Sequence, residues 1–114
     1  MKLSRFPDNN LRPDESIDDF MDGRLKVIQP RRGYRFSIDA ILLSEFVTIK
    51  PEDIVVDLGT GCGIIPLILL LTRRVGYAFG LEIQADLADQ AARNAVLNGF
   101  DIVPSSVPVL LQST

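Results

Sequence analysis

The segment from Asp53 to Pro66 constrains the fold of this chain more than any other. Its apolar residues 54–56 lead into Asp57, glycines follow at positions 59, 61 and 63, and a strongly apolar stretch begins at Ile64. This order predicts a strand, a tight turn and a helix, because glycine accepts left-handed backbone readily and lets a ligand approach the main chain. The continuous apolar run 54–56 predicts a strand covered on both faces, as in a parallel sheet. We therefore expect an α/β fold with a ligand-binding loop at residues 57–63.

Composition narrows the classes of protein that are possible. With 114 residues, 46% of them hydrophobic and 24% charged, the chain suffices for one small globular domain. Its net charge of −3 provides no overall attraction to nucleic acid. The sequence has no histidine and a single cysteine, Cys62, which excludes histidine-ligated metal sites and an internal disulfide and is typical of a reducing cytoplasm. The longest apolar run is about half the length of a membrane span. We expect a cytoplasmic protein without a metal site or a membrane contact.

The first half of the chain predicts an approach to the glycine loop. Residues 1–23 are polar and contain prolines, which predicts a loose N-terminal arm with one helical turn at 16–21. Residues 24–52 predict a hairpin and a helix: strand 25–29 turns at 30–33 and pairs with 34–36, and the helix begins after Ser37, with Asp39 in its first turn. Pro51 ends this helix, whose apolar face is predicted to comprise Ile38, Ile41, Leu42, Phe46 and Ile49.

Three arginines, Arg31, Arg32 and Arg35, lie near the tip of the predicted hairpin. A solvated turn is one interpretation, since runs of charge usually face water. A patch that contacts RNA phosphates is the other.

The second half predicts a βαβα unit over residues 53–100. A strand at 76–82 ends in Glu82, and a helix at 84–98 is stopped by Gly99. The tail, 101–114, diverges from this pattern. Residues 102–103 or 109–111 can form a third strand, which Pro104 and Pro108 limit to an edge strand or to no strand at all.

The spacing of the glycines separates several kinds of nucleotide loop. A dinucleotide-binding G-x-G-x-x-G loop starting at Gly59 needs a glycine at position 64, which is isoleucine. A P-loop needs a lysine, and this loop has none. Glu82 follows Asp57 by 25 residues, close to the interval of about 20 at which an acid binds ribose hydroxyls in dinucleotide folds. A turn that serves the fold alone is the remaining alternative.

The pattern Asp57-x-Gly59-x-Gly61-x-Gly63 resembles that of class I S-adenosylmethionine-dependent methyltransferases. With Phe36-Ser37-Ile38-Asp39, the segment 80–84 and Asn94-x-x-x-Asn98-Gly99, residues 17–100 are most similar to the bacterial tRNA-valine adenine-N6 methyltransferase family. The resemblance implies a Rossmann-like fold, S-adenosylmethionine as cofactor and tRNA as partner. It implies that the ammonium group of the cofactor lies near Asp57, the ribose hydroxyls near Glu82, the adenine near Ile83 and the methionyl end near Phe36 and Asp39. The loop itself contributes Gly59, Thr60, Gly61, Cys62 and Gly63.

The chain departs from that family in its last residues. Members continue to an Asn-Pro-Pro-Tyr motif that holds a flipped adenine, and no such motif follows position 100 here. We therefore expect an incomplete methyltransferase fold, with no catalytic residues and no methyl transfer by this chain alone. A non-enzymatic remnant or partner-binding module that associates through an uncovered sheet edge is an alternative. A domain for another adenine ligand is a third.

Overall fold

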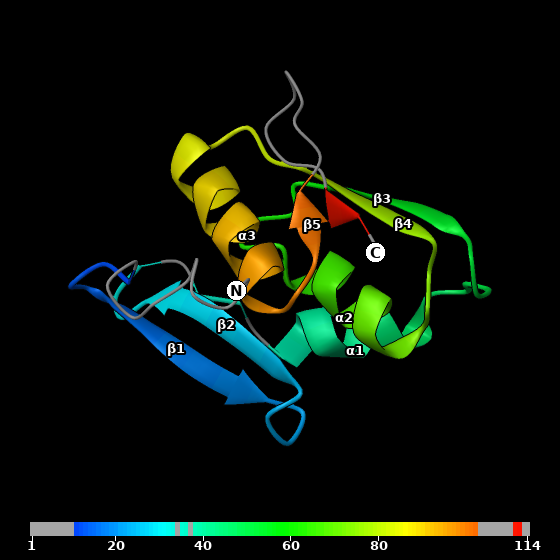
Figure 1. The fold of residues 1–114 in the computed structure, drawn as a ribbon, viewed down its shortest axis with the longest axis horizontal. Helices are drawn as coiled ribbons and strands as arrows, with labels where there is room; N and C mark the ends of the chain where they lie inside the picture. Colours follow the sequence, from blue (N-terminus) through cyan, green and yellow to red (C-terminus); the bar gives the residue numbers. More distant parts are fainter. Residues whose placement is uncertain (1–10, 34, 37, 103–110, 113–114) are drawn as a thin grey trace.

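The computed structural model describes residues 11–33, 35–36, 38–102 and 111–112 (Figure 1). These residues form a small mixed α/β domain with two sheets and three helices. In chain order the elements are β1 (Glu15–Phe20), β2 (Leu25–Pro30), α1 (Ile38–Phe46), β3 (Ile54–Leu58), α2 (Ile64–Thr72), β4 (Tyr77–Leu81), α3 (Ala85–Leu97), β5 (Asp101–Ile102) and β6 (Leu111–Gln112).

The βαβα order predicted for the second half is present in β3, α2, β4 and α3. Strands β3 and β4 are parallel, with Ile54 opposite Tyr77 and Leu58 opposite Leu81, so their carboxyl ends lie side by side. Two short strands complete the sheet in the order β3-β4-β6-β5, and β6 is antiparallel to both of its neighbours. Ile102 and Leu111, from the two tail segments predicted as alternatives for a third strand, thus both lie in the sheet. The restriction to an edge holds for β5 but was wrong for β6, which lies between β4 and β5. Pro104 and Pro108 lie outside the described residues.

Helix α2 is the centre of the hydrophobic core. Leu67 and Leu69 are at most 1% exposed. A helix that is apolar on nearly all sides has to be buried in this way. Around it pack α1, β2, β3 and β4, and Figure 1 shows α3 lying beside the β1–β2 hairpin. The buried side chains from these elements are Leu25, Val27, Ala78, Ala88, Ala91 and Ala95. In the described ranges, no helix is long and apolar enough to cross a membrane.

The N-terminal hairpin differs from the prediction. Strand β2 pairs in antiparallel register with β1, with Phe20 opposite Leu25, and not with residues 34–36. The helical turn predicted at 16–21 was also wrong, as was the loose arm for residues 15–20, which form β1. The four residues 21–24 reverse the chain, and residues 21–23 have positive φ angles. Pairing with β2 satisfies the backbone of β1, which outweighs its weak local preference. Residues 1–10, Tyr34 and Ser37 lie outside the described residues.

Two apolar surfaces predicted to be covered are open to solvent. On β3, alternate side chains are exposed, because α2 packs against one face of the β3–β4 pair and no described element covers the other. The prediction of a strand buried on both faces was therefore wrong. On α1, Ile38 is 66% exposed and Phe46 82% exposed, although Ile41 is half-buried. Helix α1 packs on α2, but this contact leaves Ile38 and Phe46 open to solvent.

Candidate functional site

The glycine loop joins the end of β3 to the start of α2. Gly59, Gly61 and Gly63 have φ angles of 71°, 61° and 84°, values that L-residues adopt only under strain. The N–H groups of Gly59 and Thr60 both donate to the carbonyl of Leu81, at 2.8 and 3.0 Å. These bonds hold the loop against the carboxyl end of β4, and the left-handed backbone explains why glycine occurs at every second position.

Glu82 lies directly beside this loop. Its carboxylate is 6% exposed, and its Oε1 accepts a hydrogen bond from the Gly61 N–H at 2.8 Å. Its Oε2 accepts from the Gln84 N–H at 2.9 Å. A carboxylate has about four acceptor positions, so each oxygen keeps capacity for a further donor. The structure thus places Glu82 where the spacing predicted it, and it also gives this residue a contact with the loop that the spacing did not predict.

Asp57 lies at the end of β3, close to Thr60 and Glu82. Burial raises the pKa of its carboxyl group, the Thr60 side chain opposes this change, and the negative charge of Glu82 adds to it. Oδ2 of Asp57 and Oγ1 of Thr60 are buried without a hydrogen-bond partner in the described part of the chain. Buried polar atoms normally have partners, so two orphaned oxygens beside an open glycine loop fit a site that binds a polar ligand.

The other predicted site residues lie in different environments, and only one of them adjoins the loop and Glu82. Ile83 follows Glu82 and is 92% exposed, so its apolar side chain is available to a ligand. Phe36 packs on Phe20 of β1 with ring centroids 4.9 Å apart, an arrangement that explains it as part of the core. Asp39 is exposed in the first turn of α1. The structure therefore brings Asp57, the loop and Glu82 together, and it assigns Phe36 a packing role.

Cys62 is fully buried within the loop. Burial raises the pKa of its thiol to about 11. A thiol with this pKa is protonated at neutral pH, so it is a poor nucleophile. Cys62 therefore fills space in the loop.

The three arginines do not form the hairpin tip. Arg31 and Arg32 are exposed in the segment after β2, whereas the hairpin turn is at residues 21–24. Arg35 donates from Nη2 to Oδ2 of Asp18 at 2.7 Å and from Nη1 to the Pro30 carbonyl at 2.6 Å. Arg35 therefore ties the end of β2 to β1, which leaves Arg31 and Arg32 as the exposed basic pair.

Asn94 was not predicted as a site residue. Its side chain is completely buried and donates from Nδ2 to the Cys62 carbonyl at 3.0 Å. The signal available in the sequence was its place in the Asn94-x-x-x-Asn98-Gly99 motif, on the face of helix 84–98 that also carries Ala91 and Ala95. A buried amide there needs polar partners from another element.

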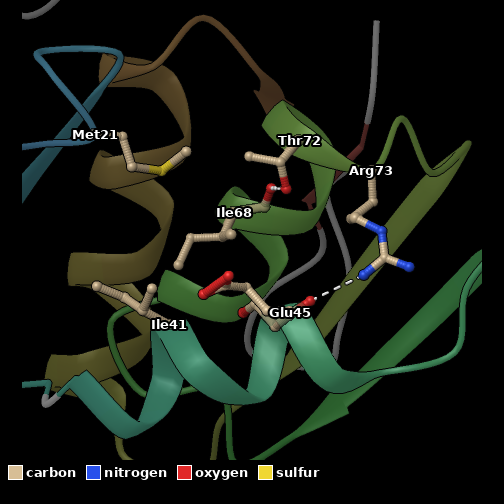
Figure 2. Close-up of a pocket in the computed structure, with 7 residues that line it drawn as sticks. Met21, Ile41, Glu45, Ile68, Thr72 and Arg73 are labelled. Carbon is tan, nitrogen blue, oxygen red and sulfur yellow. Dashed lines mark hydrogen bonds between the residues drawn. The ribbon is translucent and has the colours of Figure 1, made fainter.

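A cavity of about 540 Å³ lies away from the glycine loop, between α1, α2 and the hairpin turn. Figure 2 shows the apolar side chains of Met21, Ile41 and Ile68 around it. Arg73 borders the cavity, and its guanidinium group donates to the carbonyls of Ser44 and Ile49 at 3.1 and 3.3 Å. The Thr72 hydroxyl is bonded to the Ile68 carbonyl at 2.8 Å. The Arg73 guanidinium and the Thr72 hydroxyl thus serve the fold, and the exposed Glu45 also lines the cavity.

A second cavity, of about 310 Å³, is lined by eight residues, among them Gln84, Gln90 and Glu15. It touches the glycine-loop region through Gln84, the residue whose N–H binds Glu82. No group of three or more side chains suited to metal binding occurs among the residues that the structure describes.

Comparison with known proteins gives one informative match. Over 78 residues, the chain is 37% identical to a release factor glutamine methyltransferase of Agrobacterium fabrum. The match covers 67% of this chain and 27% of that protein, so the chain spans about a quarter of the relative's length. No family model matches the sequence. The similarity supports an S-adenosylmethionine-dependent methyltransferase in general terms, in agreement with the pattern of the glycine loop.

Proposed function

We propose that residues 57–63, Glu82 and Ile83 form the S-adenosylmethionine site of a methyltransferase with a Rossmann-like arrangement. The observation that carries this proposal is the meeting of Asp57, a loop of three left-handed glycines and Glu82 at the adjacent ends of two parallel strands. Ligands of open α/β sheets bind at this edge, outside the carboxyl ends of the strands.

The residues present suit this cofactor. The orphaned Oδ2 of Asp57 is a buried acceptor for an ammonium group, either directly or through water. Glu82 retains acceptor capacity for hydroxyl groups, and exposed Ile83 offers an apolar surface to an adenine ring. When bound, S-adenosylmethionine supplies an electrophilic methyl group. The role of the chain is to bind and orient that cofactor.

For the partner we propose a tRNA, because residues 17–100 resemble enzymes whose methyl acceptor is the amino group at N6 of an adenine in tRNA. Exposed Arg31 and Arg32 are the candidate contacts to RNA phosphates. The matched relative is named for a different acceptor, a glutamine of a release factor. Because no Asn-Pro-Pro-Tyr motif occurs in the 114 residues, we expect this chain to bind the cofactor without transferring its methyl group.

Asp57→Asn tests the site, because stability and binding should change in opposite directions. The raised pKa means that the folded state binds the Asp57 proton more tightly than the unfolded state does. The wild-type chain should therefore lose stability as the pH rises from the usual 3.8 through the raised pKa. Asparagine removes this loss and should raise the free energy of unfolding at pH 7. S-adenosylhomocysteine, measured by calorimetry, should bind about 10-fold more weakly.

Glu52→Gln is the matched control, since Glu52 is an exposed acid at the other end of β3. It should change the free energy of unfolding by less than about 0.5 kcal/mol and leave binding unaltered. Binding of NAD as tight as that of S-adenosylhomocysteine would contradict the cofactor assignment, as would no binding of S-adenosylhomocysteine by the wild type. Label transfer from S-adenosylmethionine to tRNA by the purified chain would refute the expected inactivity, and transfer to a release factor would refute the proposed partner.

A second candidate function is association with a second copy of the chain. Strand β3 lies at the end of the strand order among the described strands, and one of its faces is apolar and open. The exposed side chains on this face are Ile54 (66%), Val56 (55%), Leu58 (76%) and, on β4, Tyr77 (42%). Open edges and apolar faces of this kind favour pairing between sheets.

Sedimentation velocity tests this candidate. The wild type should form a dimer at micromolar concentration, and Val56→Lys should shift it to a monomer, because a charge would then lie at the centre of the apolar face. A wild-type chain that stays monomeric over the concentration range would eliminate association as a function. This result would leave the cofactor proposal intact, since calorimetry measures cofactor binding separately.

A further inference from the structure

Asn94 of α3 binds two parts of the chain that are far apart in sequence. It is completely buried, and its Oδ1 accepts a hydrogen bond from the Ile28 N–H of β2 at 2.6 Å. Its Nδ2 donates to the Ile28 carbonyl at 3.2 Å and to the Cys62 carbonyl in the glycine loop at 3.0 Å. One amide group therefore connects the N-terminal hairpin to the glycine loop.

Asn98, one turn later, makes the same pair of contacts with β2 two residues earlier. Its Oδ1 accepts from the Lys26 N–H at 2.9 Å, and its Nδ2 donates to the Lys26 carbonyl at 2.7 Å. Four residues of helix rise about 6 Å, and two residues of strand extend about 6.6 Å. The spacing of the two asparagines along α3 therefore matches the spacing of Ile28 and Lys26 along the unpaired edge of β2. The other edge of β2 is paired with β1. Asn98 thus attaches the hairpin to α3 as Asn94 does, but it has no recorded bond to the glycine loop among the described residues.

The Cys62 carbonyl lies just outside the helix that follows it. Gly63 is the N-cap residue of α2, and its carbonyl accepts the first helical bond, from the Leu67 N–H at 3.1 Å. The Cys62 carbonyl therefore has no place in the hydrogen-bond ladder of α2, and Asn94 is a donor to it from another element. On the preceding residue, the Gly61 N–H is bound by Glu82.

We propose that Asn94 is a positioning residue that holds the glycine loop in its ligand-binding conformation and couples it to strand β2. Glu82 at the Gly61 N–H and Asn94 at the Cys62 carbonyl are the side chains that hold the loop, in addition to the Leu81 carbonyl at its first two N–H groups. Loss of the Asn94 bond frees a buried carbonyl at the point where the left-handed glycines set the course of the main chain. This inference rests on the proposed function, since its readout is binding of the cofactor product at this loop.

The test compares Asn94→Ala with Asn98→Ala. Both variants remove a pair of bonds to β2 and should lower the melting temperature, but only the first removes the bond to the loop. Measured by calorimetry at a temperature where both are folded, the affinity for S-adenosylhomocysteine should fall about 10-fold or more in Asn94→Ala. It should stay within about twofold of the wild type in Asn98→Ala. Equal affinities in the two variants would overturn the inference.

Hydrogen exchange of the wild-type chain gives a second measurement, which decides the question even if Asn94→Ala does not fold. Addition of S-adenosylhomocysteine should slow exchange at Gly61 and at Ile28, whose N–H binds Asn94. It should leave exchange unchanged at Lys26, whose N–H binds Asn98. Protection of Gly61 without Ile28 would overturn the coupling and leave the cofactor site standing. If S-adenosylhomocysteine does not bind the wild type at all, the proposed function fails and this inference fails with it.

Discussion

Arg93→Ala is expected to lower the free energy of unfolding by about 3–5 kcal/mol, the largest effect that we predict for a single substitution. Arg93 of α3 donates from Nη1 and Nη2 to the two carboxylate oxygens of Glu15 on β1, at 2.8 and 2.6 Å. The side chains are only 13% and 6% exposed. Alanine would leave the Glu15 charge buried without its main partner, and removal of one member of a buried pair costs far more than removal of an exposed one. Urea denaturation measures the loss.

Arg12→Ala is the matched control. Arg12 pairs at 2.9 Å with Asp89, which lies on α3 as Arg93 does. The side chains of Arg12 and Asp89 are 53% and 48% exposed. Its loss should cost less than about 1 kcal/mol, because water screens an exposed pair. If Arg12→Ala and Arg93→Ala lose equal stability, burial does not explain the effect and the prediction is wrong.

The pH dependence provides an independent check on the same pair. The hydrogen bonds from Arg93 lower the pKa of Glu15 below its usual 4.5, although burial opposes this. A lowered pKa means that the stabilisation is present above pH 4.5 and is lost as the pH falls through the lowered value. In Arg93→Ala this loss on acidification should disappear, because protonation then removes an unpaired buried charge.

Gly80→Ala is expected to lower the free energy of unfolding by about 1–3 kcal/mol and to weaken binding at the glycine loop. A Cβ at position 80 of β4 would lie 2.8 Å from Cγ2 and 2.9 Å from Oγ1 of Thr60. Thr60 is 4% exposed and its N–H is bound to Leu81, so it cannot move aside without moving the loop. The added methyl group should therefore displace the glycine loop, residues 57–63, at the candidate binding site.

Thr60→Ala in the Gly80→Ala background should recover part of the lost stability, because it removes the two closest atoms and leaves Cβ at 3.0 Å. A double-mutant cycle measures this coupling, expected at about 0.5–3 kcal/mol. Gly76→Ala is the control: its Cβ would lie 2.9 Å from the backbone carbonyl oxygen of Glu52, at the opposite end of the strands. It should destabilise the chain without changing the affinity of the folded protein for S-adenosylhomocysteine. Independent, additive effects of positions 60 and 80 would contradict the steric explanation.

The second half of the fold was predictable because its signals are local. The glycines, the apolar run of α2 and the stop at Gly99 act within a few residues of their own positions, and β3, α2, β4 and α3 agree with the ranges they predicted. In the first half the signals were weaker. Gly23 marks a turn, but nothing in residues 15–20 shows that they pair with β2 across that turn.

The placement of the candidate site could be predicted only in outline. Parallel strands with an acid at the end of each place Asp57 and Glu82 near one loop whatever the rest of the chain does. The packing of Phe36 on Phe20 was not visible, because it depends on the hairpin that the sequence did not predict. The pairing of Arg35 with Asp18 depends on the same hairpin.

By itself, the sequence determined that a glycine loop joins a strand to a buried helix and that an acid follows each of the two strands. These features depend on backbone sterics and on residues close together in the sequence. Only the tertiary structure decided which groups hold that loop. Glu82 reaches the Gly61 N–H across 21 residues, and Asn94 joins Ile28 to Cys62 across 66 and 32 residues. Contacts over such separations follow from how the elements pack, since a buried N–H or carbonyl must be satisfied by whichever group packing brings to it.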